Sequence, residues 1–245
     1  MDLPPALEAA WGLRDHPRKG PKPGLTLPKI IEAAIRLADR DGLEAVSMAR
    51  VAAELSAAPM SLYRHVASKD DLLELMADTA WGPPPAMTGD TWRAKLAAWA
   101  WAMRSAMYQH SWALRVPVSG LPVYPNNVAW FEQGLAAVAD TPLTEGQKAS
   151  VVLLVSGYVR NEATTGTDIA AAIRARADGS SDPAAEWMRQ YRDLMTKIAD
   201  PVRFPATVRL LESGVFDTSD PPDDEFVFGL DRILDGIERL IDQDA

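Results

Sequence analysis

The sequence contains no cysteine, which excludes disulfide frameworks, thiolate zinc sites and cysteine nucleophiles. Its three histidines, His16, His65 and His110, lie far apart, so we expect no metal site. No apolar run approaches the roughly 18 residues that a membrane span needs, and residues 1–5 lack the basic and apolar regions of a signal peptide. We therefore expect a soluble, cytoplasmic protein that does not bind membranes.

Basic charge is scarce overall but concentrated near the N-terminus. The 245 residues hold 25 Lys and Arg against 34 Asp and Glu, a net charge of −9. Between Arg14 and Lys29, however, five basic residues accompany a single acid, Asp15. Because nucleic-acid binding requires cations that neutralise phosphates, this segment is compatible with a DNA partner. The alternative is a solvated basic tail.

Proline and glycine divide the chain into three predicted parts. Residues 1–27 hold five prolines and three glycines, which predicts a flexible basic arm without helix. Residues 28–81 follow the helical period and end before Gly82 and three prolines, the predicted domain boundary. Residues 82–245 are also helical in pattern, so the predicted class is all-α. The helices expected there cover residues 90–109, 111–117, 126–139, 144–176, 184–199, 203–213 and 224–242.

Residues 28–81 predict a helix-turn-helix, in which one helix crosses the DNA backbone and the next enters the major groove. Pro28 begins the first helix and Gly42 ends it as a left-handed cap, while Ser47 and Ser68 are predicted N-caps. The helix expected over residues 58–65 leaves several side chains off its apolar face that suit base edges and phosphates. They are Met60, Ser61, Tyr63, Arg64 and His65.

Three segments of this region resemble the DNA-binding domain of TetR-type transcriptional repressors. They are residues 26–34, 41–48 and 61–73, and the last, which reads SLYRHVASKDDLL, is the most specific. The resemblance covers about residues 25–81 of the chain. It implies a homodimer that binds a palindromic, double-stranded operator DNA and leaves it when a small-molecule effector occupies the C-terminal domain.

The resemblance also implies residue roles. Ser47 and Tyr63 would contact phosphates, Met60 and Ser61 would contact bases, and His65 and Lys69 would hold the DNA backbone. In the arm, the candidates for DNA contacts are Arg18, Lys19 and Lys22. The alternatives are a core aromatic for Tyr63, a packed histidine for His65 and a solvated cation for Lys69.

One position departs from the family pattern. The turn between the two helices usually carries a left-handed glycine, and here the sequence reads Leu55-Ser56-Ala57. Placing Ser56 in the left-handed conformation would cost about 1 kcal/mol of folding free energy compared with glycine. The sequence therefore leaves open whether this turn, and with it the docking angle of the recognition helix, is altered.

Aromatic residues and methionines cluster between residues 92 and 131, where they predict either core or a ligand pocket, since such pockets are apolar with few polar groups. The candidate ligand-binding residues are Trp99, Met103, Met107, Trp130, Phe131, Gln133, Tyr158, Asn161 and Glu162, with Asn127 as a further polar candidate. This half resembles, more faintly, the effector domain of the tetracycline repressor. Trp99 and Pro117 stand where that protein carries a polar drug-binding residue and a metal-binding histidine. We therefore expect an apolar or aromatic effector, bound without metal or other cofactor.

The last predicted helix carries an apolar seam suited to helix packing. The seam consists of Phe226, Leu230, Ile233, Ile237 and Leu240. Together with helix 144–176 it could form an intersubunit four-helix bundle, as the resemblance also implies. Packing within its own chain is the alternative.

Two other functions have to be weighed against that of a transcriptional regulator. The chain has no Gly-rich phosphate loop, nucleophile elbow or HExxH motif, so an enzyme is not predicted. The acidic charge and Ser56 leave one alternative open, a helical small-molecule-binding or protein-interaction module without specific DNA binding.

Overall fold

The computed structural model describes residues 3–13, 25–117, 122–176, 181–217, 221 and 223–244. Across these residues every regular element is a helix and no strand occurs, which confirms the predicted all-α class. The helices form two compact units, residues 1–163 with 233–245, and residues 164–232. Each unit is considered by itself below.

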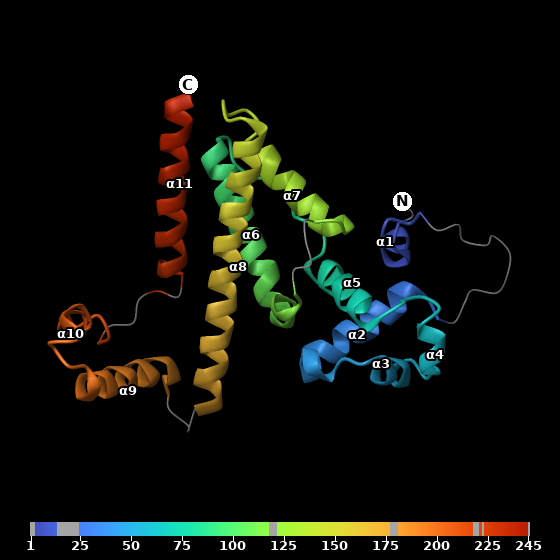
Figure 1. Ribbon diagram of the computed structural model, residues 1–245, viewed down its shortest axis with the longest axis horizontal. Helices are drawn as coiled ribbons and strands as arrows, with labels where there is room; N and C mark the ends of the chain where they lie inside the picture. Colours follow the sequence, from blue (N-terminus) through green and yellow to red (C-terminus); the bar gives the residue numbers. More distant parts are fainter. Residues whose placement is uncertain are drawn as a thin grey trace. The chain divides into compact units, whose positions relative to one another are not determined.

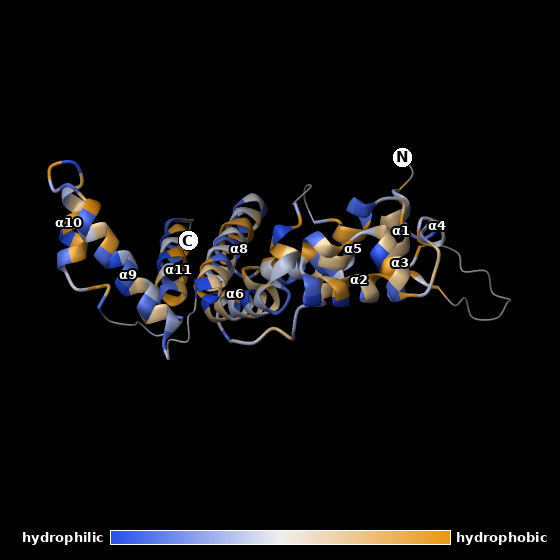
Figure 2. Ribbon diagram, turned by 90° about the horizontal axis from the view of Figure 1, so that it is seen from below, coloured by the Kyte–Doolittle hydropathy of each residue, from blue (hydrophilic) through white to orange (hydrophobic). Residues whose placement is uncertain are grey.

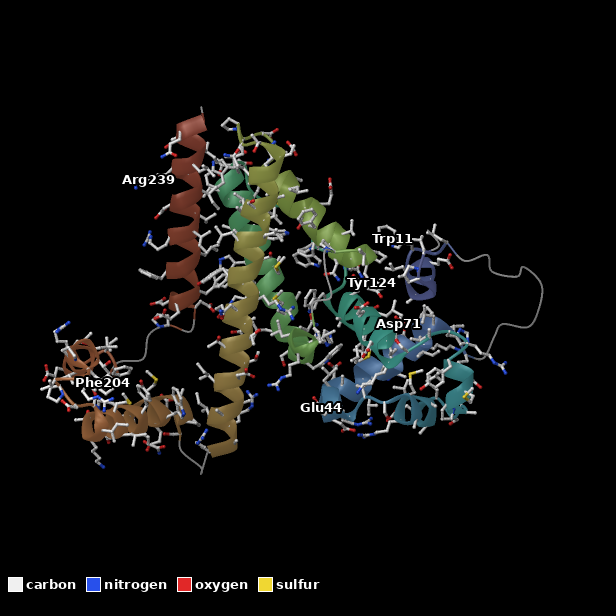
Figure 3. All side chains as sticks on the ribbon, in the orientation of Figure 1. Trp11, Glu44, Asp71, Tyr124, Phe204 and Arg239 are labelled. Atoms are coloured by element: carbon white, nitrogen blue, oxygen red, sulfur yellow. The ribbon has the colours of Figure 1, made fainter. Side chains whose placement is uncertain are left out.

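A short helix, α1 (Pro5–Ala10), corrects the prediction of a helix-free arm. Pro5 lies in its first turn, where a missing N–H is tolerated, so this proline begins a helix instead of preventing one. Ala6 is buried, and Nε1 of Trp11, which is labelled in Figure 3, donates a hydrogen bond to the carbonyl oxygen of Val123 at 2.9 Å. The predicted DNA contacts Arg18, Lys19 and Lys22 lie outside the described residues.

The region predicted to bind DNA contains α2 (Leu27–Asp41), α3 (Met48–Glu54), α4 (Pro59–Leu62) and α5 (Lys69–Trp81), with a 3₁₀ turn, η1 (Leu43–Ala45), after α2 (Figure 1). Their apolar faces share one core, which includes Ile30, Leu37, Val51, Leu62 and Met76. Helix α2 ends at Gly42 as predicted, but φ +84° and ψ +164° place this glycine outside the left-handed helical region. Helix α4 ends at Leu62, earlier than predicted, and residues 63–65 form a turn.

The remainder of the first unit comprises α6 (Trp92–Gln109), η2 (Ser111–Arg115), α7 (Pro125–Ala137), the first part of α8 (Glu145–Arg176) and the last part of α11 (Asp224–Asp244). Each helix predicted between residues 82 and 245 begins and ends within two residues of the helix that the structure shows there. Residues 111–115, however, form a 3₁₀ helix instead of an α-helix. Arg93 on α6 pairs with Asp235 and Glu238 on α11, which attaches the C-terminal helix to this unit.

The second unit contains the last part of α8, α9 (Pro183–Ile198), α10 (Pro205–Glu212) and the first part of α11. Trp187 stacks on Tyr191, and Tyr191 packs at an angle against Phe216, with ring centroids 5.5 Å apart. Hydrophobic and hydrophilic residues alternate along α9 and α10 (Figure 2). Leu194 and Ile198 on α9 are exposed.

Candidate functional site

The segment predicted to enter the major groove has one buried and one accessible face. Leu62 and Val66 are buried in the core of this region, whereas Met60 is 72% exposed and Tyr63 is 45% exposed. Tyr63 is thus not a core aromatic. The predicted contact residues on the accessible side are Met60, Ser61, Tyr63, Arg64 and His65, of which Ser61 and His65 are half-buried. The sequence pattern therefore assigned the two faces correctly.

Two serines begin the helices on either side of this segment. Ser47 Oγ accepts a hydrogen bond from the backbone N–H of Arg50 (3.2 Å), and Ser68 Oγ accepts one from that of Asp71 (3.0 Å). Both N-caps occur where the sequence predicts them. Lys69 follows Ser68 in the first turn of α5 and is exposed. Its charge therefore lies close to the positive end of the helix dipole.

The turn between α3 and α4 has the geometry that glycine usually provides. Ser56 has φ +51° and is the one non-glycine residue with positive φ in the described part of the chain. Its N–H donates to Ala53 O at 3.0 Å, and the N–H of Ala57 donates to Ala52 O at 2.9 Å. These two bonds define a Schellman motif. The serine accordingly adopts the left-handed conformation, at the cost noted above, and the turn retains its form.

An ion-pair network joins the end of α2 to α3. Arg40 pairs with Asp41 and Glu54, and Arg50 Nη2 lies 2.6 Å from Asp41 Oδ2. The hydrogen bond that Asp41 accepts from Arg40 lowers the pKa of the Asp41 carboxyl group. Because these side chains are well exposed, each pair contributes little stability. The network instead fixes the direction of Arg50 on the outer surface of α3.

The aromatic cluster surrounds a cavity of about 340 Å³ between α6, α7 and α8. All five predicted aromatic and methionine residues line it, namely Trp99, Met103, Met107, Trp130 and Phe131. Its other apolar lining residues include Trp81, Pro122, Val152 and Leu153, and its polar ones are Asn127, Ser156 and Arg160. A mainly apolar wall with a few polar groups is typical of a small-molecule site.

Trp99 is held in the cavity wall from two sides. Its Nε1 donates to the carbonyl oxygen of Trp130 at 3.0 Å, and Nε1 of Trp130 donates to Gly82 O at 3.0 Å. A Cβ atom at Gly134 would lie 3.0 Å from Trp99 Cζ2 and from Val152 Cγ1. Only glycine therefore allows α7 to approach Trp99 and α8 so closely.

Four polar residues predicted to bind the ligand lie outside the cavity wall. They are Gln133, Tyr158, Asn161 and Glu162. Gln133 Nε2 donates to Pro85 O at 2.6 Å. Glu162 accepts two bonds of 3.0 Å from Arg104 and one of 3.1 Å from the hydroxyl of Tyr108. Burial and this carboxylate raise the pKa of Tyr108. Glu162 therefore serves an ion-pair cluster and does not face the ligand space.

Two polar lining residues escaped the sequence interpretation, Ser156 and Arg160. Val152, Ser156 and Arg160 follow one another at i, i+4 spacing and so share one face of α8. That spacing was the available signal, but it does not say which face points inward. Arg160 Nη2 donates to Leu114 O at 2.7 Å and to Val116 O at 3.2 Å, at the end of η2. Burial lowers the pKa of its guanidinium.

Hydrogen bonds connect the cavity to the helix-turn-helix region. Asp78, near the end of α5, is 5% exposed. It accepts bonds of 2.8–3.3 Å from the backbone N–H and the side-chain amide of both Asn126 and Asn127, in the first turn of α7. Asn127 also lines the cavity. A carboxylate at this position stabilises α7 through the helix dipole and ties the cavity wall to α5.

Two further contacts join the same regions. Asp39 Oδ1 on α2 accepts a 2.6 Å bond from Trp112 Nε1 and lies 2.8 Å from His110 Nδ1, at η2. The hydroxyl of Tyr124, a residue just before α7 that is labelled in Figure 3, donates to Glu74 Oε2 on α5 at 2.7 Å. Burial and this carboxylate raise the pKa of Tyr124 strongly. A shift of η2 or α7 would thus act directly on α2 and α5.

The predicted dimer seam on α11 is largely covered within one chain. Phe226, Leu230 and Ile237 are buried, which is what packing within the chain predicts, while Ile233 and Leu240 are half-buried. On α8, by contrast, Leu153 and Leu154 are both 53% exposed.

The described residues contain neither a metal-binding cluster nor a membrane-spanning helix. No group of three or more His, Cys, Asp or Glu residues there could hold a metal ion, and the cavity lining includes no carboxylate or imidazole. In the same part of the chain, no helix has both the length and the apolar character to cross a membrane.

Comparison with known proteins identifies the family. The chain matches the family models "Bacterial regulatory proteins, tetR family" over residues 30–76 and "Tetracyclin repressor-like, C-terminal domain" over residues 83–241. It is 38% identical to the HTH-type transcriptional repressor DrrR1 of Streptomyces coeruleorubidus, across 99% of this chain and 88% of that protein. It is 33% identical to an HTH-type transcriptional regulator of Saccharopolyspora erythraea, across 72% of this chain and 79% of that one. The chain belongs to the TetR family of DNA-binding transcriptional regulators.

Solved structures give the same assignment. Apo ActR from Streptomyces coelicolor matches with a TM-score of 0.73 at 25% identity, covering 92% of this chain and all of that one. ActR in complex with actinorhodin matches with a TM-score of 0.69 at 26% identity, over 88% of this chain and 97% of that one. BioQ with its double-stranded DNA operator matches with a TM-score of 0.52 at 25% identity, over 58% of this chain and 87% of that one.

Proposed function

We propose that this chain is a cytoplasmic repressor that binds a palindromic operator as a homodimer and is released by a small apolar or aromatic effector. The observation that carries this proposal is Asn127, which both lines the apolar cavity and bonds to Asp78 of α5. An effector that displaces α7 changes this contact, and with it the position of the helix-turn-helix. The solved relative ActR binds actinorhodin, which supports a small-molecule effector here.

The DNA contacts follow from the accessible face of the helix-turn-helix. Met60 and Ser61 would contact base edges, Tyr63 would contact a phosphate, and Arg64 would reach the DNA from the same side. Lys69, with the N-terminus of α5, would hold one phosphate. Ser47 and His65 would contact the backbone at the edges of this surface, and the basic arm would follow the neighbouring phosphates.

A dimer supplies the second half-site that a palindromic operator requires. Because Phe226, Leu230 and Ile237 are covered within the chain, the exposed Leu153 and Leu154 on α8 would provide much of the intersubunit contact, with Ile233 and Leu240 at its edge. Gly236 has open space where a Cβ would lie, so a partner helix could approach α11 closely there.

The test is a fluorescence anisotropy titration with duplexes from the DNA upstream of the chain's own gene, repeated over a salt series. A repressor should select one duplex over a scrambled control, and its log affinity should fall steeply with log salt, by about 0.9 per phosphate contacted. Light scattering should find a dimer at the same concentrations. A monomer without duplex affinity at low salt would instead support the alternative, a helical binding module that does not recognise DNA.

A further inference from the structure

We propose that Trp81 recognises the effector through its indole N–H, which selects aromatic ligands that carry a hydrogen-bond acceptor such as a ketone oxygen. This inference rests on the proposed function of the cavity as the effector site. It adds the chemical class of the ligand and one residue that distinguishes it, neither of which follows from an apolar wall alone.

The first argument is an unsatisfied donor in the cavity wall. Trp81 lines the cavity, and in the described part of the chain its Nε1 is the one buried side-chain nitrogen or oxygen without a hydrogen-bond partner. Buried polar groups in proteins are almost always bonded, because removing a donor from water without giving it a partner is unfavourable. A ligand oxygen that accepts from Nε1 removes this cost, whereas a ligand without an acceptor leaves it in place.

The second argument is the contrast with two other tryptophans that line the cavity. Trp99 Nε1 donates to the carbonyl oxygen of Trp130, and Trp130 Nε1 donates to that of Gly82, each at 3.0 Å. The backbone thus already satisfies both of these indole N–H groups, and they offer a ligand only the surfaces of their rings. Of these three indoles, Trp81 is the one whose donor remains for a ligand.

The third argument is the position of Trp81 in the chain. It is the last residue of α5, and Gly82 ends that helix at φ +62°, with its N–H bonded to Asp78 O at 3.2 Å. The ring borders the cavity but Nε1 itself is shielded, so an acceptor reaches it only when the ring turns. A ligand with an acceptor binds this turned form more tightly and so favours it. Recognition of the ligand therefore changes the packing at the end of α5, the helix that follows the recognition segment.

The experiment compares two probes of nearly equal shape, 9-fluorenone and fluorene, by quenching of tryptophan fluorescence in the full chain. Only fluorenone carries an acceptor, its ketone oxygen. In a wall without a free donor the ketone would bind less tightly, because its oxygen would lose its hydrogen bonds to water. We expect fluorenone instead to bind the wild-type chain at least about fivefold more tightly. Equal affinities, a preference for fluorene or no binding of either probe would overturn the proposal.

Substitutions then assign the preference to one residue. Trp81→Phe keeps an aromatic ring but removes the N–H, and should make the ketone bind no more tightly than the hydrocarbon. Trp130→Phe removes an indole N–H that is already bonded, and should leave the ketone preference unchanged even if it weakens both probes. Ser156→Ala should also leave it unchanged, since the serine hydroxyl donates to Leu153 O at 3.1 Å. A ketone preference that survives in Trp81→Phe would contradict the proposal.

A nuclear magnetic resonance spectrum of the indole N–H groups tests the bond itself. The Nε1–H resonance of Trp81, assigned through its own backbone in the wild-type chain, should move downfield with fluorenone and far less with fluorene, because hydrogen bonding deshields the proton. A purely structural role of the ring predicts equal shifts for both probes, and that result would overturn the proposal. This measurement decides the question even if Trp81→Phe does not fold.

Operator binding in the same samples separates this proposal from the proposed function. A chain that binds its operator but shows no ketone preference overturns the role of Trp81 and leaves DNA binding intact. A chain that prefers the ketone but binds no operator supports the role of Trp81 and contradicts the repressor.

Discussion

Asp78 Oδ1 accepts two hydrogen bonds from Asn127, one from its backbone N–H at 2.8 Å and one from its side-chain amide at 3.0 Å. The carboxylate belongs to α5, which directly follows the recognition segment, and the asparagine belongs to the cavity wall. A ligand that displaces Asn127 therefore acts on the helix-turn-helix through a single buried side chain.

Asp78→Asn should weaken this link. The substitution removes the charge that four N–H groups share, and we expect a loss of about 2 kcal/mol in the free energy of unfolding. The effector concentration needed for operator release should also change. Urea denaturation and an operator release assay measure the two effects. Asp140→Asn, at an exposed position beyond the end of α7, should change stability by less than about 0.5 kcal/mol. Matching results for both variants would exclude a coupling role for Asp78.

Tyr63→Ala and Lys69→Ala should each weaken operator binding without unfolding the protein, because both side chains are exposed. We expect about a 10-fold loss for each, and a decrease of about one in the salt slope for Lys69→Ala, since it removes one phosphate contact. Anisotropy titrations over a salt series measure both quantities. Lys197→Ala, an exposed lysine on α9, is the control. If both variants bind as tightly as the wild type, the docking surface is placed wrongly.

Ser56→Gly should stabilise the protein by about 0.5–1 kcal/mol, because glycine adopts a positive φ without strain. Thermal unfolding of the operator-free chain measures the change. Ser105→Gly makes the same replacement at an exposed position within α6 and should destabilise the chain by about 0.5 kcal/mol. A destabilised Ser56→Gly variant would show that the serine side chain contributes more than the strain removes.

Gly134→Ala should impair ligand binding. The new methyl group would meet Trp99 and Val152 at 3.0 Å, so one of them must move, and we expect a loss of about 1–3 kcal/mol in stability. The affinity of the cavity for an aromatic probe should fall as well, as measured by quenching of tryptophan fluorescence. Gly146→Ala, where nothing lies within 4 Å of the added Cβ, should be neutral or slightly stabilising. An unchanged affinity for this aromatic probe in Gly134→Ala would show that Trp99 is free to adjust.

The helix-turn-helix was predictable because its determinants are local. Ser47 and Ser68 cap helices through bonds that span three residues, and the apolar spacing placed Leu62 inside and Tyr63 outside. The sequence does not predict helix α1, because a high density of proline opposes helix, although Pro5 is compatible with a first turn.

The polar residues of the cavity were harder to predict. The sequence shows that Tyr158, Asn161 and Glu162 share one face of α8, but only packing decides which face meets the cavity, and it is the one with Ser156 and Arg160. A charged residue is expected at the surface by default, so the sequence does not predict that Arg160 lines the cavity.

The bond from Trp11 to Val123 has a practical consequence for anyone who expresses this protein. Starting the chain at its first long helix would delete the indole and leave apolar surface next to α5 in contact with water. Such a shortened product would be prone to aggregate, and an affinity tag is better attached at the other terminus.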